Sequence, residues 1–340
     1  MNRLVTAAAL TAGAIFTARR VARSSRAISF EGKTVIITGG SRGLGLLLAR
    51  RFAAEGARLA ICSRNQVELD AASEELSKIT DVHAEVCDVS VEHYVHSFIR
   101  NVTSRFGGID VVINNAGTIM VGPMETMQPA DYDEAMRIHF YGPLYMTLAA
   151  LPSMRTRETG RIVNISSIGG LVPVPHLLPY TASKFALTGF SLGLREELLK
   201  DNIYVTTVFP GLIRTGSPRN AWFKGKNELE YAWFKLGDSL PLVSQNADRA
   251  AHYIIESCRH GDAKLVTSVP ASLAAKLYVL FPEMMTDLYA LANYLLAAPG
   301  GIGPRRAKGF ESESTFTKSP LMALTEQAAR RNNEINPTSL

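Results

Sequence analysis

The sequence predicts a doubly wound α/β fold, in which helices cover both faces of a parallel sheet. Seven short runs rich in valine and isoleucine recur between residues 33 and 270, and amphipathic stretches separate most of them. Strands that alternate with helices indicate βαβ units, whose right-handed crossovers build a parallel sheet. The seven runs are KTVIIT, ARLAIC, VHAEVC, IDVVIN, RIVNIS, IYVTTVF and KLVTSV.

The composition excludes several classes of protein. At 340 residues, with 46% hydrophobic and 20% charged residues, the chain can bury a sizeable core. The net charge of +5 lies largely near the two ends and forms no basic stripe with aromatics, so we expect no nucleic-acid partner. Three cysteines without CxxC spacing argue against structural zinc and for a reducing, cytoplasmic compartment, and we predict no metal site.

The first predicted strand runs into TGGSRGLG, residues 38–45, and a helix follows directly. Glycines at a strand-to-helix turn let a diphosphate approach the backbone, and the helix amino terminus supplies free N–H groups and partial positive charge. The lysine of a triphosphate-binding loop is missing, which disfavours triphosphate hydrolysis. The residues predicted to bind a dinucleotide here are Gly39, Ser41, Arg42, Gly43, Leu44 and Gly45.

The end of the second strand indicates which dinucleotide binds. An NAD site usually has a carboxylate near this point, whereas this chain has Ser63 and Arg64. A guanidinium suits a 2′-phosphate, and Arg42 adds a second positive charge. We therefore predict NADP(H) rather than NAD(H). The alternative is that Arg64 only caps a strand end in solvent.

The next two strand ends add polar groups to the same edge of the sheet. Asp88, followed by Val89, is placed to accept from the adenine amino group or to act as the N-cap of the next helix. NNAG at residues 114–117 has amides that can brace the sheet. Its small residues leave room for the cofactor, so the predicted cofactor contacts here are Asn115, Ala116 and Gly117.

A tyrosine and a lysine, Tyr180 and Lys184, lie four residues apart after a proline, so a helix places them on one face. With TGxxxGxG, NNAG, a serine 13 positions before YxxxK, and PGxxxT at 210–215, this pattern resembles the short-chain dehydrogenase/reductase family over about residues 31–270. The resemblance implies that Tyr180 is the general acid/base, that Lys184 lowers its pKa and holds the nicotinamide ribose, and that Ser167 steadies the substrate oxygen.

The resemblance also implies that the PGxxxT loop covers the nicotinamide amide, through Pro210, Gly211, Ile213 and Thr215. One position departs from the family pattern, because His139 stands where an asparagine usually helps to hold a proton-relay water. Either the imidazole positions that water or joins the relay, or the helix backbone alone serves. We expect turnover to be reduced but retained.

These features predict a single Rossmann-like NADP-binding catalytic domain over residues 31–270, with an extension at each end. Residues 1–30 form an apolar and basic segment. At about 1.5 Å per residue, Leu4 to Ala18 spans roughly 22 Å as a helix, short of a hydrocarbon core about 30 Å thick. It is either an anchor at the cytoplasmic face of a membrane or a frayed amphipathic extension. Residues 271–340 are predicted to form an amphipathic helical stretch and, from about 305, a loosely ordered polar tail.

Aromatic residues in the predicted lid indicate the substrate class. Trp222, Phe223, Trp233 and Phe234 favour an apolar carbonyl or alcohol: lipid-like, sterol-like or a bulky ketone. The apolar stripe from Leu273 to Leu295, interrupted at Pro282, has three open fates: packing on the domain core or on a partner subunit, covering the substrate cleft, or lying on a membrane surface.

We therefore predict an NAD(P)-dependent oxidoreductase that interconverts a carbonyl and a secondary alcohol. The resemblance further implies a homo-oligomer. The rival hypothesis is a non-enzymatic NADP-binding sensor or scaffold, which would need the cofactor motif but not the Ser, Tyr and Lys set.

Overall fold

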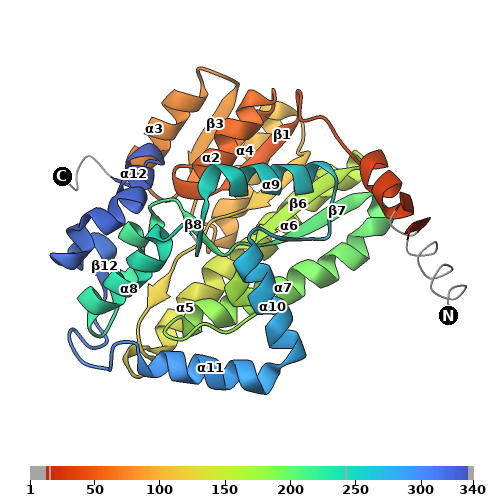
Figure 1. Cartoon of the computed structure of the whole chain (residues 1–340). Helices are drawn as coiled ribbons and strands as arrows, with labels where there is room; N and C mark the ends of the chain where they lie inside the picture. The colour runs from red at the N-terminus through yellow and green to blue at the C-terminus, as the bar shows by residue number, and fades with distance from the viewer. Residues whose placement is uncertain (1–12, 15–16, 242, 336–340) are drawn as a thin grey trace, which may run out of the picture.

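The centre of the structure is a seven-stranded parallel sheet (Figure 1). The structure, a computed structural model, describes residues 13–14, 17–241 and 243–335. The strand order is β11-β7-β6-β4-β1-β2-β3, and every neighbouring pair is parallel. Each of the seven predicted runs forms one strand, so the predicted doubly wound fold is confirmed. The strands are β1 (Thr34–Thr38), β2 (Arg58–Ser63), β3 (Val82–Val86), β4 (Val111–Asn114), β6 (Gly160–Ile165), β7 (Ile203–Phe209) and β11 (Lys264–Val266).

The strand order reverses at β1: β2 and β3 lie on one side of it, and the later strands lie on the other. This strand pairs with β2 on one side and β4 on the other, with Ile36 opposite both Ala60 and Val112. All five residues of β1 are buried, as expected of a central strand covered on both faces. A crevice opens outside the carboxyl ends of the strands at such a switch point, and ligands bind there in open α/β sheets.

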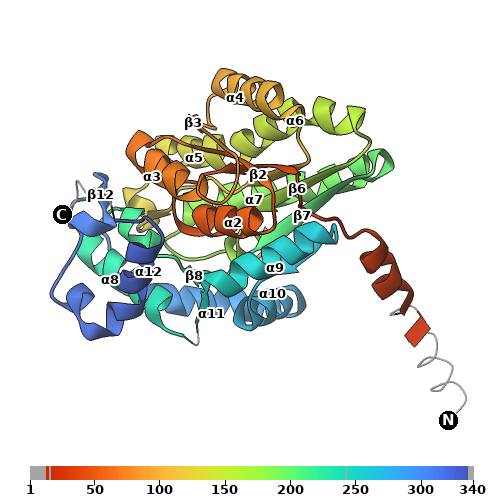
Figure 2. The same ribbon diagram turned by 90° about the horizontal axis from the view of Figure 1, so that it is seen from above.

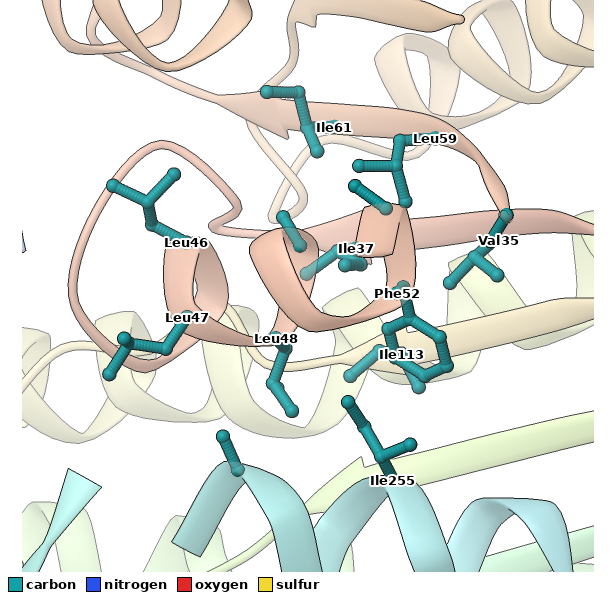
Figure 3. Close-up of a cluster of buried hydrophobic side chains, with 14 of the residues drawn as sticks. Val35, Ile37, Leu46, Leu47, Leu48, Phe52, Leu59, Ile61, Ile113 and Ile255 are labelled. Atoms are coloured by element: carbon teal, nitrogen blue, oxygen red, sulfur yellow. The ribbon is translucent and has the colours of Figure 1, made fainter. Parts of the chain in front are cut away.

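Two helical layers cover the sheet (Figure 2). α2, α3 and α9 pack on one face, and α4, α6 and α7 pack on the other. On the first face, Phe52 of α2 and Ile255 of α9 meet Val35 and Ile113 of the sheet (Figure 3). The helices are α2 (Gly43–Ala54), α3 (Gln66–Leu76), α4 (Glu92–Phe106), α6 (Gly142–Thr156), α7 (Leu178–Leu198) and α9 (Ala247–Arg259).

Two local features place chemically active side chains at the crevice. α5 (Pro129–Met136) continues into a single π-helical segment, Arg137–Tyr141, which contains His139. Such π-bulges are often found at functional sites. α7 has a proline in its first turn, so Tyr180 lies at its start and Lys184 one turn later.

Above the carboxyl edge lies a smaller subdomain. β5 (Met120–Val121), β9 (Trp222–Phe223) and β12 (Ala307–Lys308) form one small sheet, and β8 (Leu212–Arg214) pairs with β10 (Ser244–Asn246). α8 (Asn227–Ser239) supplies Tyr231 and Phe234 to a separate apolar core that also contains Phe223. The lid predicted from the aromatic residues is therefore a packed unit.

The apolar stripe after residue 269 forms two helices, α10 (Val269–Leu280) and α11 (Pro282–Tyr294), and is split at Pro282 as expected. Most large side chains of this stripe face outward rather than pack on the domain's own core. The exposed ones are Val269, Leu273, Val279, Leu280, Phe281, Met284, Leu288, Leu291, Tyr294 and Leu295.

The expectation of a loosely ordered tail from about residue 305 is wrong. That segment includes β12 and α12 (Ala323–Arg331), and it buries Met322, Thr325 and Ala329. The polar composition of this segment suggested disorder, but a few apolar side chains spaced along it are enough to dock the segment on α8.

At the other end of the chain, a helix over residues 17–25 is tied to the body by Arg23, whose Nε lies 2.8 Å from Asp262 Oδ1. Most of the predicted anchor, residues 4–12 and 15–16, lies outside the described residues. Within the described ranges, no helix has the length and apolar character needed to cross a membrane.

Candidate active site

A cavity of about 1090 Å³ opens at the carboxyl edge of the sheet. It is lined by the β1–α2 turn, by the ends of β2, β3, β4 and β6, by the start of α7, and by the loop after β7. Every site residue predicted from the sequence lines this cavity except Gly45. Residues far apart in the chain are thus brought together as the motif order predicted.

The glycine-rich turn is held in place by the NNAG segment. Thr38 Oγ1 accepts from the backbone N–H groups of Asn115 and Ala116, both at 3.0 Å, and Asn115 Nδ2 donates to Thr38 O at 3.0 Å. Gly45 lies behind the turn, where a Cβ would come within 2.0 Å of Gly39 O. It therefore allows the helix to approach the turn closely, without itself facing the cavity.

The predicted sheet braces are present. Asn114 Nδ2 donates to Asn164 Oδ1 at 2.8 Å, and Asn164 Nδ2 donates to Ser191 Oγ at 2.9 Å, which ties β4 and β6 to α7. Ser166 Oγ donates to the backbone carbonyl of Lys184 at 3.2 Å. Buried polar groups thus fix the strand ends that carry the site.

Arg64 lies at the end of β2 with its side chain 60% exposed, and its Nη1 is 3.9 Å from Asp88 Oδ2. Asp88 Oδ1 accepts from the backbone N–H and the hydroxyl of Ser90, at 2.9 and 2.7 Å. The N-cap of α4 is Val91, so the alternative that Asp88 caps that helix is wrong. Arg64 faces the cavity as well as solvent.

Arg42 is more constrained than the sequence predicted. Its Nε lies 3.5 Å from Glu68 Oε2, and its Nη1 lies 3.2 Å from Glu334 Oε2. Both carboxylates also line the cavity. Its positive charge is therefore already shared with two acidic groups of the protein.

Tyr180, Lys184 and Ser167 meet at one end of the cavity. Lys184 Nζ donates to Ile165 O at 2.8 Å and lies 5.6 Å from the Tyr180 ring centroid. Ser167 Oγ accepts from the Gly169 N–H at 3.0 Å. Burial raises the pKa of the Tyr180 phenol, and a hydrogen bond with Ser167 partly offsets it. Burial lowers the pKa of Lys184 to about 7.

His139 packs edge-on against the Tyr180 ring, with 5.4 Å between ring centroids. Its Nε2 accepts from the Thr118 N–H at 3.1 Å, which requires the ring proton on Nδ1. Nδ1 lies 2.8 Å from Ser183 Oγ, which donates to Tyr180 O at 2.8 Å. Burial, aided by the charge of Lys184, lowers the pKa of His139 well below its usual value. The geometry therefore favours a neutral imidazole that positions Tyr180.

Sequence reasoning missed several lining residues. They come from segments without a recognisable motif, namely Glu68 and Asp238 on helices, Tyr289 of α11, and Lys308 and Glu334 from the C-terminal segment. Burial raises the pKa of Asp238 to about 7. No spacing in the sequence marks these side chains, and the places of Tyr289, Lys308 and Glu334 depend on how the C-terminal segment folds back. No group of His, Cys, Asp and Glu suited to hold a metal occurs among the described residues.

A model of the short chain dehydrogenase family matches residues 33–224, more than half of the chain. The chain belongs to the short-chain dehydrogenase family. A dehydrogenase/reductase SDR family protein 7-like from Anopheles gambiae is 35% identical over 217 residues, which cover 61% of this chain and 67% of that protein.

Solved structures share this fold. A metagenomic short-chain oxidoreductase in complex with NADP has a TM-score of 0.52 at 34% identity, covering 55% of this chain and 86% of that one. L-Sorbose reductase from Gluconobacter frateurii, complexed with NADPH and L-sorbose, has a TM-score of 0.62 at 26% identity, covering 70% and 96%. Residues 225–340 of this short-chain dehydrogenase lie beyond the family match.

A neutral, positioning His139 predicts two different outcomes for two substitutions. His139→Asn should leave the midpoint of the pH profile of turnover unchanged, because the imidazole does not titrate in the working range. His139→Phe should lower the free energy of unfolding by about 1–3 kcal/mol, since it leaves a buried N–H without its acceptor.

Urea unfolding and turnover from pH 5 to 10 measure both effects. His252→Phe, on the exposed face of α9, is the matched control and should change neither. A shifted midpoint in His139→Asn would restore a direct role for the imidazole in proton transfer.

Proposed function

We propose that this short-chain dehydrogenase interconverts a carbonyl and a secondary alcohol with a nicotinamide cofactor. The observation that carries the proposal is that Ser167, Tyr180 and Lys184 share one cavity with the glycine-rich turn. Each group alone has a structural explanation. Together they combine a dinucleotide site with a proton donor, an oxygen-binding hydroxyl and a buried ammonium.

The residues have complementary parts in the proposed reaction. A nicotinamide bound beside Tyr180 supplies or accepts the hydride. In reduction, Tyr180 donates its phenolic proton to the substrate oxygen, and burial keeps that proton in place near neutral pH. Ser167 donates a second hydrogen bond to the same oxygen as charge develops there. In oxidation, the ammonium of Lys184 stabilises the phenolate that takes the proton from the alcohol.

Tyr180→Phe tests the reaction directly. A positioned acid/base contributes about 10²–10⁴-fold to rate, so we expect turnover to fall by at least about 100-fold. The affinity for cofactor should change by no more than about threefold. Oxidation of NADPH with a panel of hydrophobic ketones measures turnover, and quenching of protein fluorescence measures cofactor binding.

The exposed Tyr253 of α9 gives the matched control, Tyr253→Phe. Full activity of Tyr180→Phe would overturn the proposal. Cofactor binding by the unmodified protein without turnover of any substrate would favour a sensor or scaffold.

We propose that NADP(H) is preferred over NAD(H), and that Arg64 is the main reason. Arg42 is shared between Glu68 and Glu334, whereas the guanidinium of Arg64 is largely open to the cavity and solvent. The relatives solved with NADP and NADPH support the same preference. A hydrogen bond to a charged partner contributes about 1.5–3 kcal/mol.

Arg64→Ala should therefore weaken NADPH binding at least about tenfold and leave NADH binding within about twofold. Isothermal titration calorimetry with both cofactors measures the ratio. Arg105→Ala, which removes an exposed arginine paired with Asp81, is the control. Equal losses for both cofactors would show that Arg64 does not read the 2′-phosphate.

The substrate end of the cavity supports an apolar carbonyl compound or alcohol as substrate. Next to Tyr180 the wall consists largely of hydrophobic side chains, namely Ile119, Val172, Val174, Leu177, Trp233, Phe234 and Tyr289. Of the four predicted lid aromatics, Trp233 and Phe234 line the cavity. Phe223 instead lies in the small core, and Trp222 is covered by Lys308, whose Nζ is 3.5 Å from the ring centroid.

We propose that the α10–α11 hairpin docks on a lipid surface at the cytoplasmic face of a membrane. Its apolar side chains face outward on successive turns, and Tyr289 of the same hairpin reaches the cavity wall. A lipid surface beside the mouth would deliver an apolar substrate directly. A second copy of the chain, expected from the family's usual homo-oligomers, is the competing occupant.

Replacing Leu288 and Leu291 together by glutamate separates the two occupants. On phosphatidylcholine vesicles, the intact chain and a chain lacking residues 1–26 should float, whereas the double variant should not. Leu148→Glu, an exposed leucine of α6, is the control. Absence of flotation, together with a dimer in light scattering that the double variant dissociates, would instead assign the hairpin to a subunit interface.

A further inference from the structure

The C-terminal segment returns to the first turn of the fold. α12 packs on α8 and β8, and both views show it beside α2 (Figures 1 and 2). The carbonyl oxygen of Arg331, its last residue, accepts from the Arg50 guanidinium of α2 at 3.2 Å. The chain therefore leaves α12 directly at the glycine-rich turn. We call residues 332–334 the strap.

The strap joins two loops that line the cofactor end of the cavity. Asn332 O accepts from the Gly43 N–H at 2.8 Å, and Asn332 Nδ2 donates to Thr215 O at 3.1 Å. Asn333 Nδ2 donates to Ser41 O at 3.0 Å and to Glu68 O at 3.2 Å. One short segment thus holds the β1–α2 turn and the loop after β8 together.

Glu334 completes the strap. Only 4% of this residue is exposed, and its carboxyl group accepts from Asn220 Nδ2 at 2.6 Å and pairs with Arg42. Gly43 has φ +56°, and a Cβ there would lie 2.5 Å from Glu334 Oε1. The absence of a side chain at Gly43 therefore serves two needs, a left-handed backbone and close contact with the strap.

The position of the strap has a consequence for any dinucleotide in the cavity. Arg64 and Asp88 follow β2 and β3, whereas Tyr180 and Lys184 lie on α7 beyond β4 and β6, and the turn with Gly43 follows β1 between them. Thr215 and Glu334 lie beside Gly43 and line the cavity there. A dinucleotide that reaches both ends must pass the point where the strap bridges the two loops. Because the cavity keeps about 1090 Å³ with the strap in place, the strap forms a wall rather than a plug.

We propose that residues 332–334 are positioning residues that close the cofactor cleft, so that the bound dinucleotide leaves only when the strap detaches. The proposal rests on the proposed function, because the occupant is the nicotinamide cofactor. It adds a role for residues outside the family match. Strap detachment breaks the bonds of Asn332 and Asn333, so weakening them should speed cofactor release without removing any group that takes part in proton transfer.

Two variants of the full protein test the strap, Asn333→Ala and a chain ending at Arg331. Loss of the two Asn333 hydrogen bonds, at about 0.5–1.5 kcal/mol each, should raise the NADPH dissociation rate about tenfold. The shorter chain should release NADPH at least as fast. Stopped-flow fluorescence with excess NADP⁺ as the competing ligand measures the rate, and thermal melting checks that both variants are folded.

Arg331→Ala is the matched control, because its side chain pairs with Asp248 on α9 and not with the turn. If the variants bind NADPH and release it at rates within twofold of the unmodified protein, the strap proposal is wrong and the proposed function is unaffected. The strap proposal is also wrong if the shorter chain binds NADPH faster but releases it at the original rate. That result would mean that the segment competes with NADPH for the cleft. Failure of the unmodified protein to bind NADPH would overturn the proposed function itself.

Discussion

Two backbone N–H groups of NNAG donate to a single threonine hydroxyl at the end of β1, and the geometry of the crevice depends on this pair of bonds. Thr38 is 2% exposed, and loss of its hydroxyl would leave both N–H groups without this acceptor. The bonds fix the end of β4 against the start of the glycine-rich turn. Ser41 and Gly43 of that turn meet the strap.

Burial, more than pairing of charges, controls the ionisable groups at the substrate end. Lys184 is 5% exposed, and its pKa of about 7 lies below the value of about 10.4 expected when unfolded. This lysine therefore disfavours the folded state fully below pH 7, and the penalty is relieved as pH rises from about 7 to about 10. In return, an ammonium that is buried away from water stabilises a developing phenolate more strongly than an exposed one would.

The fold and the residues around the cavity could be predicted because they follow local rules. The buried runs mark the seven strands, and the glycine turn and the Tyr180–Lys184 spacing are short-range patterns. The residues that sequence reasoning missed depend on long-range packing. Glu334 reaches Gly43 only because α12 docks on α8. Docking relies on a few apolar side chains, such as Met322, in a segment whose composition suggested a loose tail. The ring tautomer of His139 follows from the Thr118 N–H, which donates to Nε2, a contact that spacing along the chain does not reveal.

The π-helical segment at Arg137–Tyr141 amounts to one extra residue within an otherwise continuous helix. Each residue of an α-helix turns the chain by about 100°. A deletion of one residue here would restore regular winding, and the side chains within the segment would change their direction around the helix axis by up to that angle. The imidazole would then leave the tyrosine ring, although no side chain in the crevice had been replaced. The length of this segment is therefore as much a determinant of the site as its amino acids are.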